Sequence, residues 1–166
     1  MKTTTLLNLQ TPLTVYFDGS CALCRSEVNN IAVRDGGRNL VIVDCSALDF
    51  DDSGLPVTRA EMMNFFHARD AAGTWIRGVD VFIAIYAAGE LDWVSRILRH
   101  RWIKPYAIRA YPWLIRNRYR IAALGLHRIL NFFTHRAYRN NQRRQAREAL
   151  ARSRLCIDGA CELPKE

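Results

Sequence analysis

The sequence has no long uninterrupted apolar segment. Its longest apolar stretches are broken by arginines, such as Arg96, Arg99 and Arg116, well before the roughly eighteen residues that a membrane-spanning helix needs. Residues 1–10 also lack a basic start followed by a long apolar run, the mark of a secretory signal peptide. We therefore expect a cytoplasmic protein that is soluble or at most peripheral to a membrane.

The sequence has few cysteines, and their number is odd. Five cysteines in 166 residues argue against a secreted scaffold in which paired disulfides replace a hydrophobic core. The composition is instead that of an ordinary globular protein, with 49% hydrophobic and 24% charged residues. The length suits one compact domain with an appendage rather than two ordinary domains.

Acidic residues are few in the second part of the chain. Residues 96–166 carry 17 Lys and Arg against 4 Asp and Glu, whereas residues 1–95 carry 7 against 12, so the net charges are +13 and −5. This asymmetry predicts an acidic catalytic body joined to a basic helical region, which suits an anionic partner or membrane surface.

The chain begins with the pattern of a strand, a turn, a helix and a second strand. Residues 13–17 are β-branched and aromatic, and residues 18–20 supply turn chemistry. Apolar residues then recur at helical spacing over 23–32, and residues 40–43 read Leu-Val-Ile-Val, typical of a buried parallel strand. The opening is therefore a βαβ unit, which requires a right-handed crossover.

The next segment predicts a short helix, a hairpin and another helix. Residues 58–61 form a capping box. Residues 63–69 and 74–77 have the pattern of a β-hairpin, and helical apolar periodicity resumes over 79–88. The order βαβ, α, ββα is that of thioredoxin, so we predict an α/β, thioredoxin-like fold.

Beyond Gly89 the sequence is helical in character, with expected helices over 91–99, 105–116 and 118–154. We therefore predict a thioredoxin-like fold with a basic C-terminal helical extension. The expected division is an N-terminal tail (1–12), a core (13–90), the basic helical extension packed on the core (91–154) and a tail (155–166).

Cys21 and Cys24 form a Cys-x-x-Cys pair at the junction of the first strand and helix. There the unpaired N–H groups and the helix dipole stabilise a thiolate, so Cys21, expected in the first helical turn, is the candidate nucleophile. Cys24 lies one turn on along the same side, where it can attack a mixed disulfide at Cys21. This pattern predicts thiol–disulfide exchange.

Other roles for the cysteines stay open. The pair could be half of a zinc site completed by Cys156 and Cys161, or by Cys45, or it could consist of two inert buried thiols. Cys45 is most simply a small buried thiol. Cys156 and Cys161 close a short disulfide, pass electrons to Cys21 from the tail, or are incidental thiols. The histidines show no ligand spacing, so we assign no metal.

Asp18 precedes Cys21 by three residues, where its carboxylate can exchange a proton with a thiol. The structural alternative is that it forms the turn and caps the helix that carries Cys21. A carboxylate close to Cys21 opposes ionisation of the thiol, so activation of the nucleophile is not its purpose.

The segment Tyr16–Cys24 (YFDGSCALC) resembles the signature of the DCC thiol-disulfide oxidoreductases, named for Asp, Cys and Cys. Asp70–Phe82 is similar to that family's hairpin and following helix, and Tyr111–Arg120 looks like its Tyr and Asn-Arg segment. The resemblance covers roughly residues 13–125. It implies a thioredoxin-like fold, a redox role and a position near the cysteines for Asp80, whose alternative role is a helix cap.

One departure from thioredoxin concerns the strand predicted at 63–69. Thioredoxins place a cis-proline directly before this strand, opposite the active-site cysteines, and this chain has no proline there. The usual peptide-docking surface is therefore not expected in its usual form.

The sequence thus predicts a thiol–disulfide oxidoreductase in which the Cys21 thiolate attacks a disulfide and Cys24 resolves the mixed disulfide. Asp18 is the predicted group that accepts or returns a proton. The predicted supporting residues are Gly19, Ser20 and Asp80. The predicted enzyme needs no cofactor beyond the redox-active disulfide, and its partner is a protein or small thiol. Two alternatives are a structural zinc site and a non-catalytic basic module. For such a module, anionic lipid is favoured over nucleic acid because tryptophans and tyrosines mix with the arginines.

Overall fold

A computed structural model describes residues 9–125 and, beyond them, isolated helical positions. These positions are Phe132, Arg136, Arg139, Gln142, Arg143, Ala146, Arg147, Leu150 and Ala151. The predicted tail 155–166 and most of the segment 126–154 therefore lie outside the described residues.

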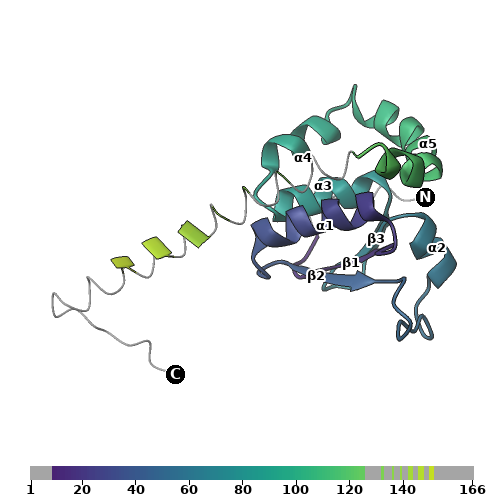
Figure 1. The fold of residues 1–166 in the computed structure, drawn as a ribbon, viewed down its shortest axis with the longest axis horizontal. Helices are drawn as coiled ribbons and strands as arrows, with labels where there is room; N and C mark the ends of the chain where they lie inside the picture. The colour runs from purple at the N-terminus through teal and green to yellow at the C-terminus, as the bar shows by residue number, and fades with distance from the viewer. Residues whose placement is uncertain are drawn as a thin grey trace.

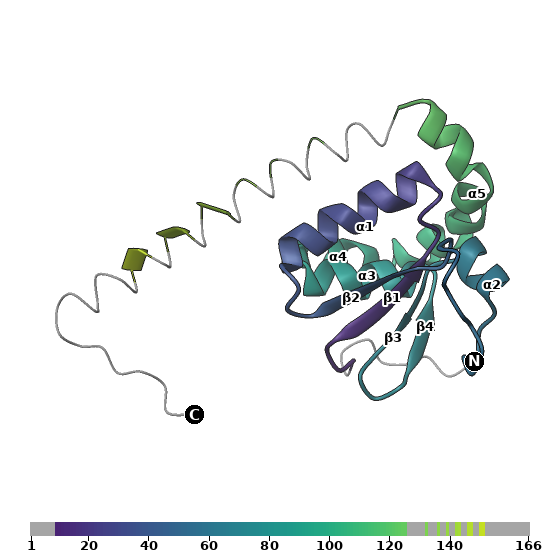
Figure 2. The ribbon, with the colours of Figure 1, turned by 60° about the horizontal axis from the view of Figure 1, so that its bottom comes forward.

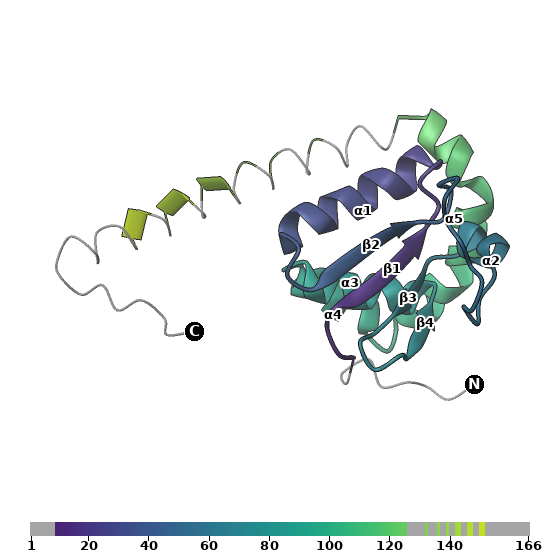
Figure 3. The same cartoon turned by 90° about the horizontal axis from the view of Figure 1, so that it is seen from below.

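A four-stranded mixed sheet forms the centre of the molecule (Figure 3). Its strands are β1 (Leu13–Phe17), β2 (Leu40–Asp44), β3 (His67–Arg69) and β4 (Trp75–Arg77), in the order β2-β1-β3-β4. β1 pairs in parallel with β2, and the other two pairings are antiparallel. With the helices, this arrangement is the thioredoxin-like α/β fold that the sequence predicts.

The two faces of the sheet are covered differently. Val15 and Phe17 of β1 point to a core shared with helices α1 (Ala22–Asp35) and α3 (Val79–Ala88). Tyr16 points to the opposite face, where it stacks on Trp75 at 5.2 Å between ring centroids. The short helix α2 (Arg59–Asn64) lies near this second cluster through its buried Met62.

The connection from α1 to β2 is organised by a buried carboxylate. Gly36 ends the helix in the left-handed region (φ 65°), as expected for a residue without a Cβ. Asp35 then accepts hydrogen bonds from the backbone N–H groups of Asn39 and Leu40. These bonds hold the end of α1 against the start of β2, the strand that pairs in parallel with β1.

Helices α4 (Asp92–Arg99) and α5 (Lys104–Ala123) form an outer layer, with α1 and α3 between them and the sheet (Figure 1). Their inward-facing Leu98 and Tyr111 pack on Ile83 of α3. In the part of the chain that the structure describes, no helix combines the length and apolar character needed to cross a membrane.

Two predicted boundaries are wrong. The strand expected at 63–69 begins only at His67, because the capping box at Thr58 starts a helix that continues to Asn64 and buries Met62. The break expected near residue 117 is also absent: α5 runs through Pro112 to Ala123 and ends before Gly125, whose φ is 83°.

Candidate active site

Cys21 and Cys24 lie together at the amino end of α1. Cys21 is the N-cap residue rather than a member of the first turn, which corrects the predicted placement by one position. Its backbone is extended, and its Sγ accepts a hydrogen bond from the Cys24 N–H at 3.4 Å. Both thiols are free. The sulfur of Cys21 therefore takes the place that a serine or aspartate oxygen usually occupies at a helix start.

The two thiols differ strongly in acidity. A hydrogen bond from the Cys24 thiol is the main reason why the pKa of Cys21 falls from 9.0 to about 6; burial opposes the fall, and backbone N–H groups and the Arg118 charge assist it. Donation of that hydrogen bond, together with burial, raises the pKa of Cys24. One thiolate and one thiol at neutral pH are what an attacking and a resolving cysteine require.

Neither sulfur is open to solvent. Cys21 is 0% exposed and Cys24 is 6% exposed. The carboxyl-terminal half of α5 lies beside the first turn of α1, above the loop that follows β1 (Figure 2). Cys21, the predicted nucleophile, thus has a lowered pKa and is buried at the same time.

Asp18 connects this loop to α5. Its Oδ1 accepts hydrogen bonds from the N–H and hydroxyl of Ser20, at 3.0 and 2.6 Å. Its Oδ2 accepts from Arg118 Nη2 at 2.8 Å and from the Tyr119 hydroxyl at 2.5 Å. Burial alone would raise the pKa of Asp18, but these hydrogen bonds and the Arg118 charge outweigh it and lower the pKa.

Asp18 does not cap α1, contrary to one of the two predicted roles, because Cys21 is itself the capping residue. Its turn-forming role is present in the bonds to Ser20. Asp18 and Cys24 line the same narrow crevice, so the carboxylate lies close to the cysteine that is predicted to resolve.

Arg118 is the functional residue that the sequence analysis missed. Its side chain is 8% exposed, and besides Asp18 it donates to the backbone oxygens of Met63 (2.8 Å) and Asn64 (3.3 Å). It thereby joins α5 to the end of α2 and to the loop after β1. The sequence signal for Arg118 is its place in the family-like segment Tyr111–Arg120.

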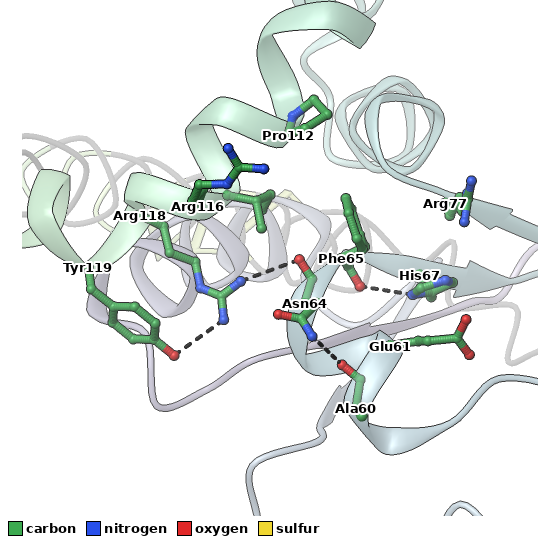
Figure 4. Close-up of a pocket in the computed structure, with 11 residues that line it drawn as sticks. Ala60, Glu61, Asn64, Phe65, His67, Arg77, Pro112, Arg116, Arg118 and Tyr119 are labelled. Carbon is green, nitrogen blue, oxygen red and sulfur yellow. Dashed lines mark hydrogen bonds between the residues drawn. The ribbon is translucent and has the colours of Figure 1, made fainter.

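A cleft of about 520 Å³ opens beside this arginine, between α2, the β3–β4 edge and α5. Figure 4 shows Arg118 and Tyr119 at one end of the cleft and His67 and Arg77 at the other. The crevice that holds Asp18 and Cys24 shares Arg118 with this cleft. The cysteine pair therefore lies next to a surface depression, with Arg118 between them.

Gly19 and Ser20 both shape the loop. The Gly19 N–H donates to Asp44 Oδ1 at 3.0 Å, and a Cβ on Gly19 would lie 2.0 Å from the other oxygen of that carboxylate. Only glycine fits this approach. Ser20 donates to Asp18, and its hydroxyl also lies 3.5 Å from the Tyr119 hydroxyl.

Asp80 has a different role from the one expected. It neither caps α3, whose N-cap is Gly78, nor accepts a hydrogen bond there. It forms an ion pair with Lys104 at 2.7 Å, which joins the start of α3 to the start of α5. Its contribution is to the attachment of α5 rather than to the cysteines.

Cys45 lies away from the pair. It is fully buried against Met62, in the cluster on the opposite face of the sheet, and burial is the main cause that raises its pKa to about 11. These are the properties of an inert thiol.

No group of three or more His, Cys, Asp or Glu side chains in the described part of the chain is arranged to hold a metal ion. This finding covers Cys21, Cys24 and Cys45. Cys156 and Cys161, the other residues of the zinc alternative and of the tail disulfide, lie outside the described residues.

The place of the thioredoxin cis-proline is taken by phenylalanine. Phe66 directly precedes β3, and its N–H donates to the Tyr111 hydroxyl at 3.1 Å. Over residues 9–125 the cis peptide is Thr11–Pro12, at the other end of the sheet from the cysteines. With Arg118 bound to Met63 and Asn64, the backbone opposite the cysteines is engaged by α5.

Comparison with known proteins assigns the chain to one family. The family model of the DCC1-like thiol-disulfide oxidoreductases matches residues 15–124. An uncharacterized chloroplastic protein of Arabidopsis thaliana is 30% identical over 115 residues, which cover 67% of this chain and 52% of that protein. The chain thus spans about half the length of this curated relative. No solved structure matches the chain. The matched segment contains the whole constellation of Asp18, Cys21, Cys24 and Arg118, and the chain belongs to the DCC1-like thiol-disulfide oxidoreductase family.

Proposed function

We propose that the protein exchanges a Cys21–Cys24 dithiol for the disulfide of a partner. The Cys21 thiolate attacks one partner sulfur, forms a mixed disulfide and expels the other sulfur as a thiolate. Cys24 then loses its proton and attacks Cys21 Sγ, which closes the Cys21–Cys24 disulfide and releases the second partner thiolate. Two electrons pass to the partner, and the reverse sequence oxidises a dithiol.

The observation that carries this proposal is the placement of both thiols at the amino end of α1, where the Cys24 N–H donates to Cys21 Sγ. The lowered pKa of Cys21 favours attack at neutral pH, and the raised pKa of Cys24 keeps the second thiol protonated until the mixed disulfide forms. Once Cys21 is in a mixed disulfide, it no longer accepts the hydrogen bond that raises the pKa of Cys24. The resolving thiol then ionises more easily.

Access to Cys21 requires α5 to move, because the sulfur is buried where α5 meets α1. The same movement separates Arg118 and Tyr119 from Asp18, and loss of these two partners raises the pKa of the carboxylate. Asp18 is then a better proton acceptor for Cys24, with which it shares a crevice. Opening of the site and proton transfer are thereby linked.

The exchange partner in this proposal is a protein or a small thiol, and no cofactor beyond the disulfide takes part. The cytoplasmic location stays a prediction. The name of the Arabidopsis relative assigns that protein to the chloroplast.

A glutathione redox titration of metal-free protein tests the proposal. Aliquots are alkylated and the intact mass is read, with zinc assayed on the protein as purified. We expect Cys21 and Cys24 to be oxidised together as one two-electron couple, with a midpoint between roughly −120 and −270 mV. Cys45→Ser is the matched control and should leave the midpoint unchanged. Failure of the two cysteines to pair, or stoichiometric zinc bound to them, would contradict the proposal.

The reduced protein should also show a thiolate that appears at unusually low pH. The ultraviolet absorbance of thiolate is expected to rise with a midpoint near pH 6, and this step should vanish in Cys21→Ser but persist in Cys45→Ser. Because the folded pKa lies below the unfolded value of 9.0, the reduced fold should gain stability as pH rises from 6 to 9 and lose it as pH falls. A midpoint near 9 would refute the assignment of Cys21 as nucleophile.

A further inference from the structure

Large aromatic side chains project into solvent from α4, α5 and the turn that joins them. Trp93, Trp102, Tyr106 and Trp113 are between 63% and 69% exposed. Three of the four tryptophans of the chain are thus on this one helical layer, whereas Trp75 is packed against Tyr16. Exposed tryptophans in such number mark a contact surface rather than the ordinary scatter of apolar residues.

These side chains lie on the outer faces of the two helices. In α4, Trp93 and Ile97 are four residues apart and both are exposed, while Ser95 between them is buried and bonds to α3. In α5, Tyr106 and Trp113 are seven residues apart and share one face, and Tyr111 faces inward. The two helices form the layer farthest from the sheet (Figure 1). We call their outer side the α4–α5 surface.

The α4–α5 surface is strongly basic. Residues 92–123 carry eight Lys and Arg and one acid, Asp92, whereas residues 9–91 carry six basic and eleven acidic residues. The exposed cations are Arg96, Arg99, Arg101, Arg109, Arg116 and Arg120. Arg101 lies over the ring of Trp102, 4.7 Å from its centroid. Positive charge and exposed aromatic rings therefore occupy the same helices.

We propose that the α4–α5 surface docks on the face of an anionic lipid membrane. Tryptophan and tyrosine favour the boundary between headgroups and acyl chains, and arginines attract anionic headgroups. The exposed Ile97 and Ile103 have apolar surface that the acyl boundary can bury. A nucleic acid has no comparable apolar layer for these isoleucines. Docking of a second copy of the chain on this surface is opposed by repulsion between like charges.

Vesicle binding with tryptophan fluorescence tests this proposal on the full chain. The probes are vesicles of phosphatidylcholine alone and vesicles that also contain phosphatidylglycerol. We expect binding to the anionic vesicles that weakens as salt is raised, together with a blue shift of tryptophan emission. Residues 126–166 contain many arginines but no tryptophan, so the blue shift reports contact through the α4–α5 surface and not through that segment.

Two variants sharpen the test. Arg96→Gln with Arg99→Gln should weaken anionic-vesicle binding roughly thirtyfold, and Trp93→Ser with Trp113→Ser should remove most of the blue shift. Leu48→Ser with Arg69→Gln changes an exposed leucine and an exposed arginine outside this surface and should alter neither signal. Circular dichroism checks that each variant is folded.

Three outcomes would overturn the proposal: binding without a blue shift, equal binding to neutral vesicles, or binding to single-stranded DNA that exceeds binding to anionic vesicles. The vesicle assay uses no thiol chemistry, so its failure leaves the redox proposal unaffected.

Discussion

Cys24→Ser protein should accumulate as a mixed disulfide with its partner, and Cys21→Ser protein should lose exchange down to the rate seen without protein. The serine at 24 cannot attack Cys21 Sγ, so the reaction stops after its first step. The serine at 21 removes the nucleophile itself. The two variants are thus expected to fail at different steps, which a non-reducing gel and intact mass distinguish.

Replacing Cys24 also tests what lowers the pKa of Cys21. Cys24 supplies the hydrogen bond that most lowers the pKa of Cys21, so Cys24→Ala, which leaves no donor there, should shift the thiolate midpoint upward from about 6, whereas Cys24→Ser keeps a hydroxyl donor. Trapping by Cys24→Ala should therefore be slow at neutral pH and faster in alkaline buffer. Cys45→Ser controls for the remaining buried thiol and should neither trap nor slow exchange, because Cys45 lies in the cluster on the other face of the sheet. A mixed disulfide at Cys24 in the Cys21→Ser variant would reverse the assigned roles.

The parts of the fold that the sequence predicted are those set by local signals. The capping box at Thr58 forms as expected, with Glu61 bonded back to the N-cap. The limits of α3, predicted at 79–88, likewise depend on neighbours within a few residues. For the same reason the Cys-x-x-Cys site could be located, since its strand, turn and helix are contiguous.

The site residues that the sequence did not predict depend on distant contacts. Arg118 is 100 positions from Asp18, and in a segment rich in arginines nothing local distinguishes the one that turns inward. Asp80 shows the converse: helix-start chemistry suggested a cap, but Lys104 is its ion-pair partner.

Burial of Cys21 could not be predicted from sequence for a related reason. The position of α5 is determined by Tyr111 on α3, by Asp80 with Lys104 and by Arg118 with Asp18. Each of these contacts joins elements far apart in the chain. Together they place over the cysteines a helix that the sequence presented only as a basic extension.

Arg118→Met should be the most damaging substitution outside the cysteines. It leaves the Asp18 carboxylate buried without its cation and removes a donor from the backbone oxygens of Met63 and Asn64. Breaking a buried ion pair on one side costs about 3–5 kcal/mol of unfolding free energy. The thiolate midpoint of Cys21 should also move upward, because the Arg118 charge helps to lower the pKa of Cys21.

A double-mutant cycle separates the ion pair from a general loss of packing. Asp18→Asn with Arg118→Met should be less destabilised than the two single variants together, by roughly 0.5–3 kcal/mol, because no uncompensated charge is left buried. Arg118→Lys keeps the charge but lacks the planar fork that reaches both Asp18 and Met63. Compared with Arg118→Met, it should therefore recover the thiolate midpoint of Cys21 more completely than the free energy of unfolding. Urea unfolding of the reduced proteins measures the stability, and thiolate absorbance measures the midpoint. If the two single destabilisations are strictly additive in the double variant, Arg118 does not hold α5 through Asp18. If Arg118→Met also leaves the thiolate midpoint of Cys21 unchanged, Arg118 does not act on Cys21.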